Sequence, residues 1–260
     1  MKVIFVKVGG SFITQKDVPV KINTSALRAL AEILHRVRGR VRVVLGNGGG
    51  SFAHYTVLKY QKSPPHTLLV KCHQATRSLN RIIVDYLVES GIPATSVQTS
   101  AIICGSDGDF EVFSKPIEVL LSNDIIPVVY GECVIGGKGI SVISTEKVFE
   151  LLSRHIKVSR IVLLTDVSGI YTCNPRTCRD AKLINKITPE NVHHVLEILK
   201  STSISDATGG VYGKVLVMST FSFRTGIEVV ITSGFDVESA TQAIEGLIPE
   251  RGTIISPAEL

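Results

Sequence analysis

Short apolar runs without polar alternation recur along the chain, and they constrain its fold more than any other feature. We expect strands at VIFVKV (3–8), VRVVLG (41–46), PATSVQ (93–98), IIPVVYG (125–131), RIVLLTD (160–166) and IEVVITSG (227–234). Uninterrupted apolar strands are typical of a parallel sheet that is buried on both faces, whereas half-exposed strands alternate apolar and polar residues. The pattern therefore favours a buried, mostly parallel sheet.

Segments with apolar residues at helical spacing lie between these strands. We expect helices over 24–37, 78–90, 146–153, 189–199, 213–224 and 237–245, the first capped by Asn23 or Thr24. Strand–helix alternation predicts an α/β protein, a three-layer αβα sandwich around a mostly parallel open sheet. The segment GECVIGGKGISVIS (131–144) breaks the alternation and is predicted as an inserted β-hairpin. We expect one domain over 1–260, with lobes of about 1–150 and 151–260.

Composition excludes several classes of protein. The chain of 260 residues has 28 basic and 23 acidic side chains and a formal net charge of +5. This weak charge suits an anionic small molecule, whereas a nucleic-acid-binding protein usually concentrates basic residues on one face. The N-terminal apolar run is too short for a signal peptide, and no window approaches the ~18 apolar residues of a membrane span. We therefore expect a cytoplasmic protein without nucleic-acid or membrane partners.

The five cysteines follow no metal-binding pattern. Their number is odd, and neither a CxxC nor an HxxxH motif accompanies the one close pair, Cys173 and Cys178. We expect no zinc site and interpret the cysteines as reduced thiols of an intracellular protein.

Glycine-rich loops follow the first two strands, and a third opens a late helix. They are KVGGSF (7–12), GNGGGSFAHY (46–55) and DATGGVYGK (206–214). Ligands of open α/β sheets bind at the carboxyl ends of the strands, and helix N-termini present free N–H groups to anions. One glycine-rich turn is structural as often as functional, but three such loops joined to lysine or histidine indicate phosphate binding. Neither a dinucleotide fingerprint nor a GxxxxGK[ST] P-loop is present.

The motifs KVGGS, GNGGGSFAH, TDVSGIY and DATGGVYGK, in this order, resemble the amino acid kinase superfamily. The histidine after the second loop and the sequence at 78–93 are most similar to its isopentenyl phosphate kinases, and fosfomycin kinases share the histidine. The resemblance covers nearly the whole chain, from Lys7 to GTIIS (252–256). It implies a homodimeric, ATP- and Mg²⁺-dependent transferase of the mevalonate pathway of isoprenoid biosynthesis. Its implied acceptor is a small isoprenoid monophosphate, isopentenyl phosphate.

The resemblance also implies roles for individual residues. The implied catalytic residues are Lys7, Lys16, His54, Glu146 and Lys214. The implied nucleotide-binding residues are Gly9, Gly10, Ser11, Gly50, Asp166, Tyr171, Gly209, Gly210 and Lys214. The implied acceptor-binding residues are Gly48, Gly49, His54, Tyr86 and Thr145, and no residue is expected to bind a metal directly.

The chemistry of these residue types agrees with phosphoryl transfer, which requires cations and N–H groups around two polyanions. A lysine inside the apolar run VIFVKV is costly unless it has a partner. The stretch ISTEKV places Thr145 and Glu146 where the superfamily usually has glycine and aspartate. We therefore expect Glu146 to orient Lys7 or Lys16. The alternative is that Glu146 only favours the start of a helix.

Two further questions stay open at this stage. An isoprenoid tail needs an apolar pocket, and the candidate lining residues are Tyr55, Leu58, Leu79, Ile82, Ile83 and Tyr86, although residues at helical spacing are more often core. The alternatives to an isopentenyl phosphate kinase are another phosphate or phosphonate kinase of the superfamily and a non-catalytic nucleotide-binding sensor or storage protein.

Overall fold

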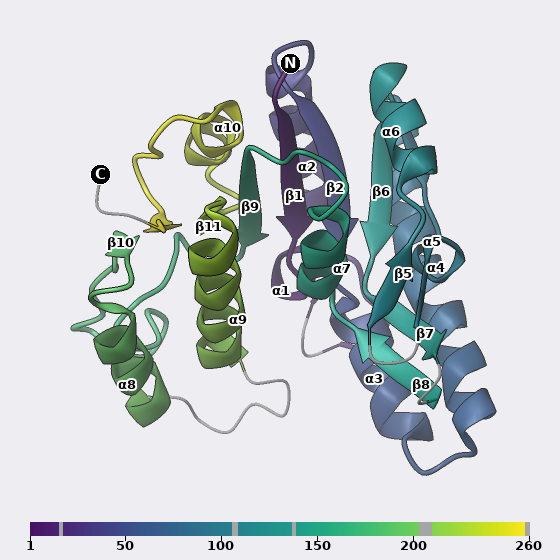
Figure 1. The fold of residues 1–260 in the computed structure, drawn as a ribbon. Helices are drawn as coiled ribbons and strands as arrows, with labels where there is room; N and C mark the ends of the chain where they lie inside the picture. The colour runs from purple at the N-terminus through teal and green to yellow at the C-terminus, as the bar shows by residue number, and fades with distance from the viewer. Residues whose placement is uncertain (16–17, 106–108, 137–138, 203–209, 258–260) are drawn as a thin grey trace.

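The structure, a computed structural model, describes residues 1–15, 18–105, 109–136, 139–202 and 210–257 (Figure 1). Its strands are β1 (Val3–Val8), β2 (Arg42–Asn47), β3 (Ala94–Ser96), β4 (Ile103–Gly105), β5 (Phe110–Val112), β6 (Ile126–Tyr130), β7 (Glu132–Gly136), β8 (Gly139–Ile143), β9 (Arg160–Thr165), β10 (Lys186–Ile187), β11 (Glu228–Ser233) and β12 (Thr253–Ile255). Its helices are α1 (Gly10–Ile13), α2 (Thr24–Val37), α3 (Gly50–Tyr60), α4 (Pro65–Glu89), α5 (Thr99–Ile102), α6 (Lys115–Ser122), α7 (Thr145–Leu152), α8 (Val192–Thr202), α9 (Gly210–Thr225) and α10 (Val237–Glu245).

The described residues form an eight-stranded sheet in the order β10-β12-β11-β9-β1-β2-β6-β3. All neighbours pair in parallel except β11 and β12, so the prediction of a mostly parallel sheet is confirmed. In Figure 1 the arrowheads of β9, β2 and β6 point to the same lower edge of the sheet. The loops after these strands therefore meet at one edge.

Helices cover both faces of the sheet and create two hydrophobic cores. Strand β1 shows the division, because Phe5 packs into one core and Ile4 and Val6 pack into the other. The Phe5 core includes the buried faces of α7 and α9, whereas the Ile4 core includes those of α2, α4 and α10. This burial on both faces explains why the strands are apolar without alternation.

Several element boundaries follow from local capping. The Asn23 side chain accepts a hydrogen bond from the Ala26 N–H and begins α2, as predicted. The Ser144 hydroxyl accepts from the Lys147 N–H and begins α7 directly after the β7–β8 hairpin, which is also confirmed. The start of α7 is important for the site because Glu146 lies in its first turn.

Helix α4 is longer than predicted, because it begins at Pro65 rather than near residue 78. The Pro64-Pro65 pair resembles a loop in the sequence, but proline at the first helical position has a suitable φ and no N–H to satisfy. The prediction also omitted the short elements β4, β5, β10, β12, α5 and α6.

The interpretation of all five cysteines as reduced thiols is wrong for one pair. Cys173 and Cys178 form a disulfide with Cα atoms 6.1 Å apart, while Cys72, Cys104 and Cys133 are free. The two cysteines flank a tight four-residue turn, which brings side chains within bonding range that sequence spacing alone does not pair.

Within the described ranges, no helix combines the length and the apolar character that crossing a bilayer requires.

Candidate active site

Two glycine-rich loops pack directly against each other where β1 and β2 end. A Cβ atom added to Gly10 would lie 2.7 Å from the Cα of Gly50, and one added to Gly48 would lie 3.1 Å from the N of Gly10. Gly50 also has φ +49°, which favours glycine. These glycines are therefore needed for the contact between the loops as well as for ligand access, which the sequence interpretation did not foresee.

Backbone N–H groups line this contact and are available to an anion. Among the described residues, no hydrogen bond takes up the N–H groups of Gly10, Ser11, Gly49 and Gly50. The loops lead into α1 and α3, and α3 is long enough for its N-terminus to carry a partial positive charge. Two neighbouring loops with free N–H groups suit two phosphate groups.

Lys7 and Glu146 form an ion pair beside these loops. The side chains of Lys7 and Glu146 are only 12% and 11% exposed. The pair joins β1 to the first turn of α7, 139 residues apart in the sequence. Glu146 is thus placed to orient Lys7, whereas the alternative of a helix-start role alone does not account for the contact.

The protonation of Glu146 follows from its surroundings. Burial would raise the pKa of the carboxyl group, but the Lys7 charge and hydrogen bond hold the pKa below its ordinary value. A backbone N–H and the charge of Lys214 act in the same direction. Glu146 is therefore a carboxylate at neutral pH, and it lies near two lysines from different halves of the chain.

Hydrogen bonds hold the buried Thr145 in place next to Glu146. Its hydroxyl donates to the Asn47 carbonyl at 2.7 Å and accepts from the Gly131 N–H at 3.1 Å, and the residue is buried. The side chain thereby ties the ends of β2 and β6 to the start of α7. These two hydrogen bonds fix the Thr145 side chain, and the acceptor-binding role expected for this residue stays a prediction.

Asp166 lies after β9 and contacts the first glycine-rich loop. The Ser11 hydroxyl donates to Asp166 Oδ1 at 2.6 Å, and Arg176 Nη2 donates to Oδ2 at 2.7 Å. The Gly9 N–H donates to the Leu164 carbonyl at 2.8 Å, so this loop also rests on the end of β9. Ser11, Gly9 and Asp166 are thus brought together as the sequence predicted, with Arg176 as an addition.

The structure describes some of the other residues that are expected to bind the nucleotide and leaves two of them out. Lys214 lies in the first two turns of α9, and Gly210 begins that helix. Tyr171 is partly buried and forms an isolated bridge with Leu183 in the loop after β9. Lys16 and Gly209 lie outside the described residues.

Comparison with known proteins agrees with this arrangement. The model of the amino acid kinase family matches residues 2–233. The chain belongs to the amino acid kinase family. An isopentenyl phosphate kinase of Methanocaldococcus jannaschii is 30% identical over 226 residues, which are 80% of this chain and 84% of that protein. A glutamate 5-kinase of Leishmania donovani is 26% identical over 98% of this chain and 95% of that protein.

Solved structures show the same fold. A crystal structure of an isopentenyl phosphate kinase has a TM-score of 0.79 and 27% identity, and covers 98% of this chain and 100% of that chain. A carbamate kinase from Giardia lamblia bound to AMP-PNP has a TM-score of 0.68, covers 99% of both chains and, at 19% identity, supports the fold alone. The sandwich around a parallel sheet is thus the amino acid kinase fold, and the chain is a kinase of that family.

His54 lies in the second turn of α3, after the second glycine-rich loop of this amino acid kinase. It is exposed, and it forms no hydrogen bond or ion pair with another described residue. Both ring nitrogens therefore remain available to a ligand near the loop. Its role at the acceptor phosphate stays a prediction.

The candidate residues for a tail pocket do not line one common cavity. Leu79 and Ile83 are fully buried in the core, so a pocket role for them is wrong. Tyr86 packs against the same core, and its carbonyl accepts a hydrogen bond from the Ser90 hydroxyl just past the end of α4. Tyr55 lines a cavity of about 380 Å³ between α3 and α4. Leu58 and Ile82 are exposed and do not line this cavity.

Two polar contacts at this edge were not predicted from the sequence. Asn80 on α4 donates to the Asn47 side chain at 2.9 Å at the end of β2. Glu132 has a fully buried side chain that accepts from the Ser100 N–H at 2.9 Å and lies 3.4 Å from Arg77 Nε. Asn47 was visible inside the GNGGGS motif, but nothing in the sequence pairs Glu132 with Arg77.

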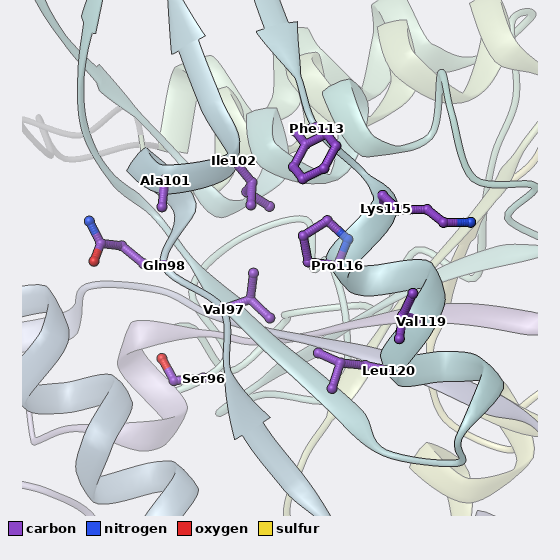
Figure 2. A pocket seen from close by; sticks show the side chains of 10 residues that line it. All are labelled: Ser96, Val97, Gln98, Ala101, Ile102, Phe113, Lys115, Pro116, Val119 and Leu120. Carbon is purple, nitrogen blue, oxygen red and sulfur yellow. The ribbon is translucent and has the colours of Figure 1, made fainter.

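A second hollow of about 530 Å³ lies beside α5 and α6, away from the Lys7–Glu146 pair. Figure 2 shows Val97, Ile102, Pro116 and Val119 around it, with Phe113 at its margin. Its lining is mostly apolar and lacks glycine-rich backbone, so it does not resemble a phosphate site.

No group of three or more His, Cys, Asp or Glu side chains within the described part of the chain could hold a metal ion.

Proposed function

We propose that the protein transfers the γ-phosphoryl group of ATP to isopentenyl phosphate and produces isopentenyl diphosphate. The observation that carries this proposal is the buried Lys7–Glu146 pair beside two glycine-rich loops with N–H groups that have no partner among the described residues. Membership in the amino acid kinase family and the similarity to isopentenyl phosphate kinases support it. An acceptor that is itself a phosphate explains why the site supplies cations and N–H groups.

The reaction needs no general base in the protein. A phosphate monoester is largely dianionic at neutral pH because its second pKa is about 6. One of its oxygens attacks the γ-phosphorus, the bond from that phosphorus to the β–γ bridging oxygen breaks, and ADP leaves with the electron pair. The amino group of Lys7, oriented by Glu146, stabilises the charge on the transferring group.

We assign the two halves of the chain to the two substrates. Residues of about 1–150 bind the acceptor through Gly48, Gly49 and His54, and residues of about 151–260 bind ATP with Lys214 and Gly210. Gly9, Gly10 and Ser11 reach the nucleotide phosphates from the first half. Mg²⁺ bound with ATP would supply positive charge at its phosphates, while the residues of this chain position the phosphate groups and Lys7 stabilises the transferring one. Lys16 and Gly209, which lie outside the described residues, are assigned by the resemblance alone to catalysis and to nucleotide binding.

The acceptor phosphate is assigned to His54 and the second glycine-rich loop. His54 is exposed, lies on α3 directly after the loop and has no other partner among the described residues. His54→Ala should lower kcat/KM for isopentenyl phosphate by about 10²–10³-fold, since it removes one preorganised donor. His54→Gln should retain more activity because an amide also donates. Unchanged kinetics in His54→Ala would remove the residue from the acceptor site.

We propose a homodimer formed through the β3 edge of the sheet. The described residues place no strand outside β3, and Phe113 and Val119 are 62% and 48% exposed beside it. Light scattering at several protein concentrations should give the mass of two chains, and Phe113→Asp should give one. A monomer in both cases would contradict this part of the proposal.

The acceptor is tested by one coupled assay of ADP release with Mg²⁺. Its acceptors are isopentenyl phosphate, dimethylallyl phosphate, fosfomycin, glutamate and other amino acids. We expect the highest kcat/KM with an isoprenoid monophosphate and none in Lys7→Met. Preference for fosfomycin would favour the alternative of a phosphonate kinase. Preference for glutamate would agree with the similarity to glutamate 5-kinases. ATP binding without turnover would favour the alternative of a non-catalytic nucleotide-binding sensor.

A further inference from the structure

A chain of polar contacts connects an exposed loop to the first glycine-rich loop. Asp166 uses both carboxylate oxygens, one for the Ser11 hydroxyl at 2.6 Å and the other for Arg176 at 2.7 Å. A carboxylate held at both oxygens cannot rotate without breaking one contact. The position of Arg176 therefore influences the orientation of the Asp166 carboxylate toward Ser11.

The loop that carries Arg176 is closed by the disulfide between Cys173 and Cys178. Within it the Asn174 carbonyl accepts the N–H groups of Thr177 at 3.1 Å and Cys178 at 2.9 Å, and the Asn174 side chain accepts the Arg176 N–H at 3.0 Å. Pro175 further restricts the turn. The backbone of Arg176 is thus fixed by contacts inside six residues.

The base of the loop is attached to the sheet independently of the disulfide. The N–H of Thr172 donates to the Lys182 carbonyl at 3.0 Å, and the N–H of Lys182 donates to the Thr172 hydroxyl at 3.1 Å. The Ile170 N–H donates to the buried Thr253 hydroxyl at 2.7 Å. Opening the disulfide should therefore release the tip with Arg176 while its base keeps its place.

The Arg176–Asp166 pair depends on this restraint. The Arg176 side chain is 65% exposed, and exposed ion pairs contribute little because two mobile groups must be ordered for a screened attraction. A covalent bridge orders the arginine beforehand by limiting the conformations of the loop. Without the bridge, the pair would form for only part of the time.

We infer that Arg176 is a positioning residue for the nucleotide, and that the Cys173–Cys178 disulfide sets nucleotide affinity by holding Arg176 on Asp166. The inference rests on the proposed role of Ser11 and Asp166 in binding the nucleotide phosphates. It makes the exposed loop a redox-sensitive element, in which oxidation strengthens and reduction weakens ATP binding.

Reduction requires a dithiol as co-reactant. A thiolate of the dithiol attacks one sulfur of the disulfide, the sulfur–sulfur bond breaks, and one cysteine leaves as a thiolate that takes up a proton. The second thiol of the reagent then attacks the mixed disulfide and releases the other cysteine. The protein gains two electrons and two protons, and the dithiol becomes a cyclic disulfide.

The test measures ATP binding to the full-length protein by calorimetry without acceptor, before and after treatment with dithiothreitol. We expect reduction to raise the Kd for ATP by about three- to fivefold, as the loss of one exposed ion pair would. In steady-state assays the KM for ATP should rise to the same extent, while kcat changes less than twofold because Lys7 and Glu146 are not moved.

Four variants make the test specific. Cys173→Ser with Cys178→Ser should match the reduced protein and no longer respond to dithiothreitol. Arg176→Ala should raise the Kd equally and also be unresponsive, whereas Arg176→Lys should recover part of the affinity. The matched control is Arg179→Ala, because Arg179 is an exposed arginine beside the loop with no ion pair to another described residue. It should leave ATP binding and its redox response unchanged.

Two results would overturn the inference. One is an Arg176→Ala protein that binds ATP as tightly as the parent, and the other is an Arg176→Ala protein that still weakens on reduction. An error in the proposed function would give a different result, because a wrong acceptor assignment leaves the measured ATP binding unchanged. A protein that binds no ATP in either redox state would contradict both proposals at once.

Discussion

Two regions of the site hold their charged groups by different means. At the centre, Lys7 and Glu146 are almost completely buried between β1 and α7, beside glycine loops that leave no space for a side chain. In the loop after β9, Asp166 pairs with the largely exposed Arg176, and a disulfide closes the loop that carries the arginine. The central pair is fixed by packing, whereas the outer pair is fixed by a covalent bridge.

The two pairs therefore differ in the free energy that is lost when they break and in how readily they can be made or lost. Removing one partner of a buried ion pair leaves an uncompensated charge and commonly costs about 3–5 kcal/mol. An exposed pair typically contributes about 0–1 kcal/mol, so it can be made or lost without endangering the fold. The centre is therefore suited to a constant catalytic geometry, and the outer loop is suited to adjusting affinity.

The strongest test of the comparison is Glu146→Gln. This change keeps the size of the side chain but removes the charge that holds Lys7, so kcat should fall by about 10²-fold, as expected for a misplaced catalytic group. The KM for ATP should change much less. Steady-state kinetics at saturating acceptor, with a melting curve to show that the protein is folded, provide the measurement.

Glu146→Asp is the matched control for this experiment, because it keeps the charge and shortens the side chain. It should retain most of the activity. If Glu146→Gln were as active as the parent and only melted slightly lower, Glu146 would be a helix-start residue and the central pair would have no catalytic meaning.

The next largest effect should come from Gly10→Ala, which tests whether packing fixes the centre. The added methyl group would lie 2.7 Å from the Cα of Gly50, so the two loops must separate. Overpacking of this kind costs about 1–3 kcal/mol, and we expect a lower Tm together with lower affinity for both substrates. Calorimetric unfolding and binding measurements would detect the two effects.

Gly39→Ala separates crowding from backbone strain. Gly39 has φ +76°, but no atom lies within 4 Å of its added Cβ. This variant should also lose some stability, because its left-handed conformation disfavours alanine. Its kcat and KM should match those of the parent. Full activity in Gly10→Ala would show that the contact between the loops does not position the substrates.

A smaller effect is expected from Asp166→Asn in the outer region. The change weakens the hydrogen bond from Ser11 and the pair with Arg176, and charged hydrogen bonds contribute about 1.5–3 kcal/mol. We expect the KM for ATP to rise by about tenfold with kcat nearly unchanged, which is the reverse of the Glu146→Gln pattern. A loss confined to kcat would place Asp166 with the central pair and abolish the contrast.

The two regions also differ in how far the sequence predicts them. A lysine within an apolar strand requires a partner, and Glu146 is the acid that follows the inserted hairpin, so the central pair could be inferred from these residues. Arg176 could not, because nothing distinguishes an exposed arginine in a loop until the turn is folded. The five-residue separation of Cys173 and Cys178 likewise gave the wrong redox state.

Packing of backbone against backbone was the other feature beyond the reach of sequence. The glycines of both loops suggested ligand binding, but the contact between Gly10 and Gly50 depends on how β1 and β2 pair. Thr145 was expected to bind the acceptor, and its hydroxyl joins the start of α7 to the end of β2, 98 residues away in the chain. Such long-range contacts follow from the register of the sheet, which a single sequence does not specify.

The smallest expected effect is the pH dependence of stability at the centre. The folded pKa of Glu146 is lowered, since the Lys7 charge and hydrogen bond outweigh the opposing effect of burial. A carboxyl group whose pKa is lower in the folded state contributes stability that is fully present above its unfolded pKa of about 4.3. That contribution is lost as the pH falls through the lower, folded pKa.

Melting curves of the parent and of the double variant Lys7→Met with Glu146→Gln, recorded from pH 7 to pH 3, isolate this contribution. The double variant removes both charges and leaves no unpaired lysine, so its other titrating groups match those of the parent. We expect the difference in Tm between the parent and the double variant to be constant above about pH 5. Below about pH 4.3 the Tm of the parent should fall by a few degrees relative to that of the double variant. A difference that stays constant to pH 3 would mean that Glu146 titrates alike in the folded and unfolded states. The central pair would then contribute no pH-dependent stability, although it is buried.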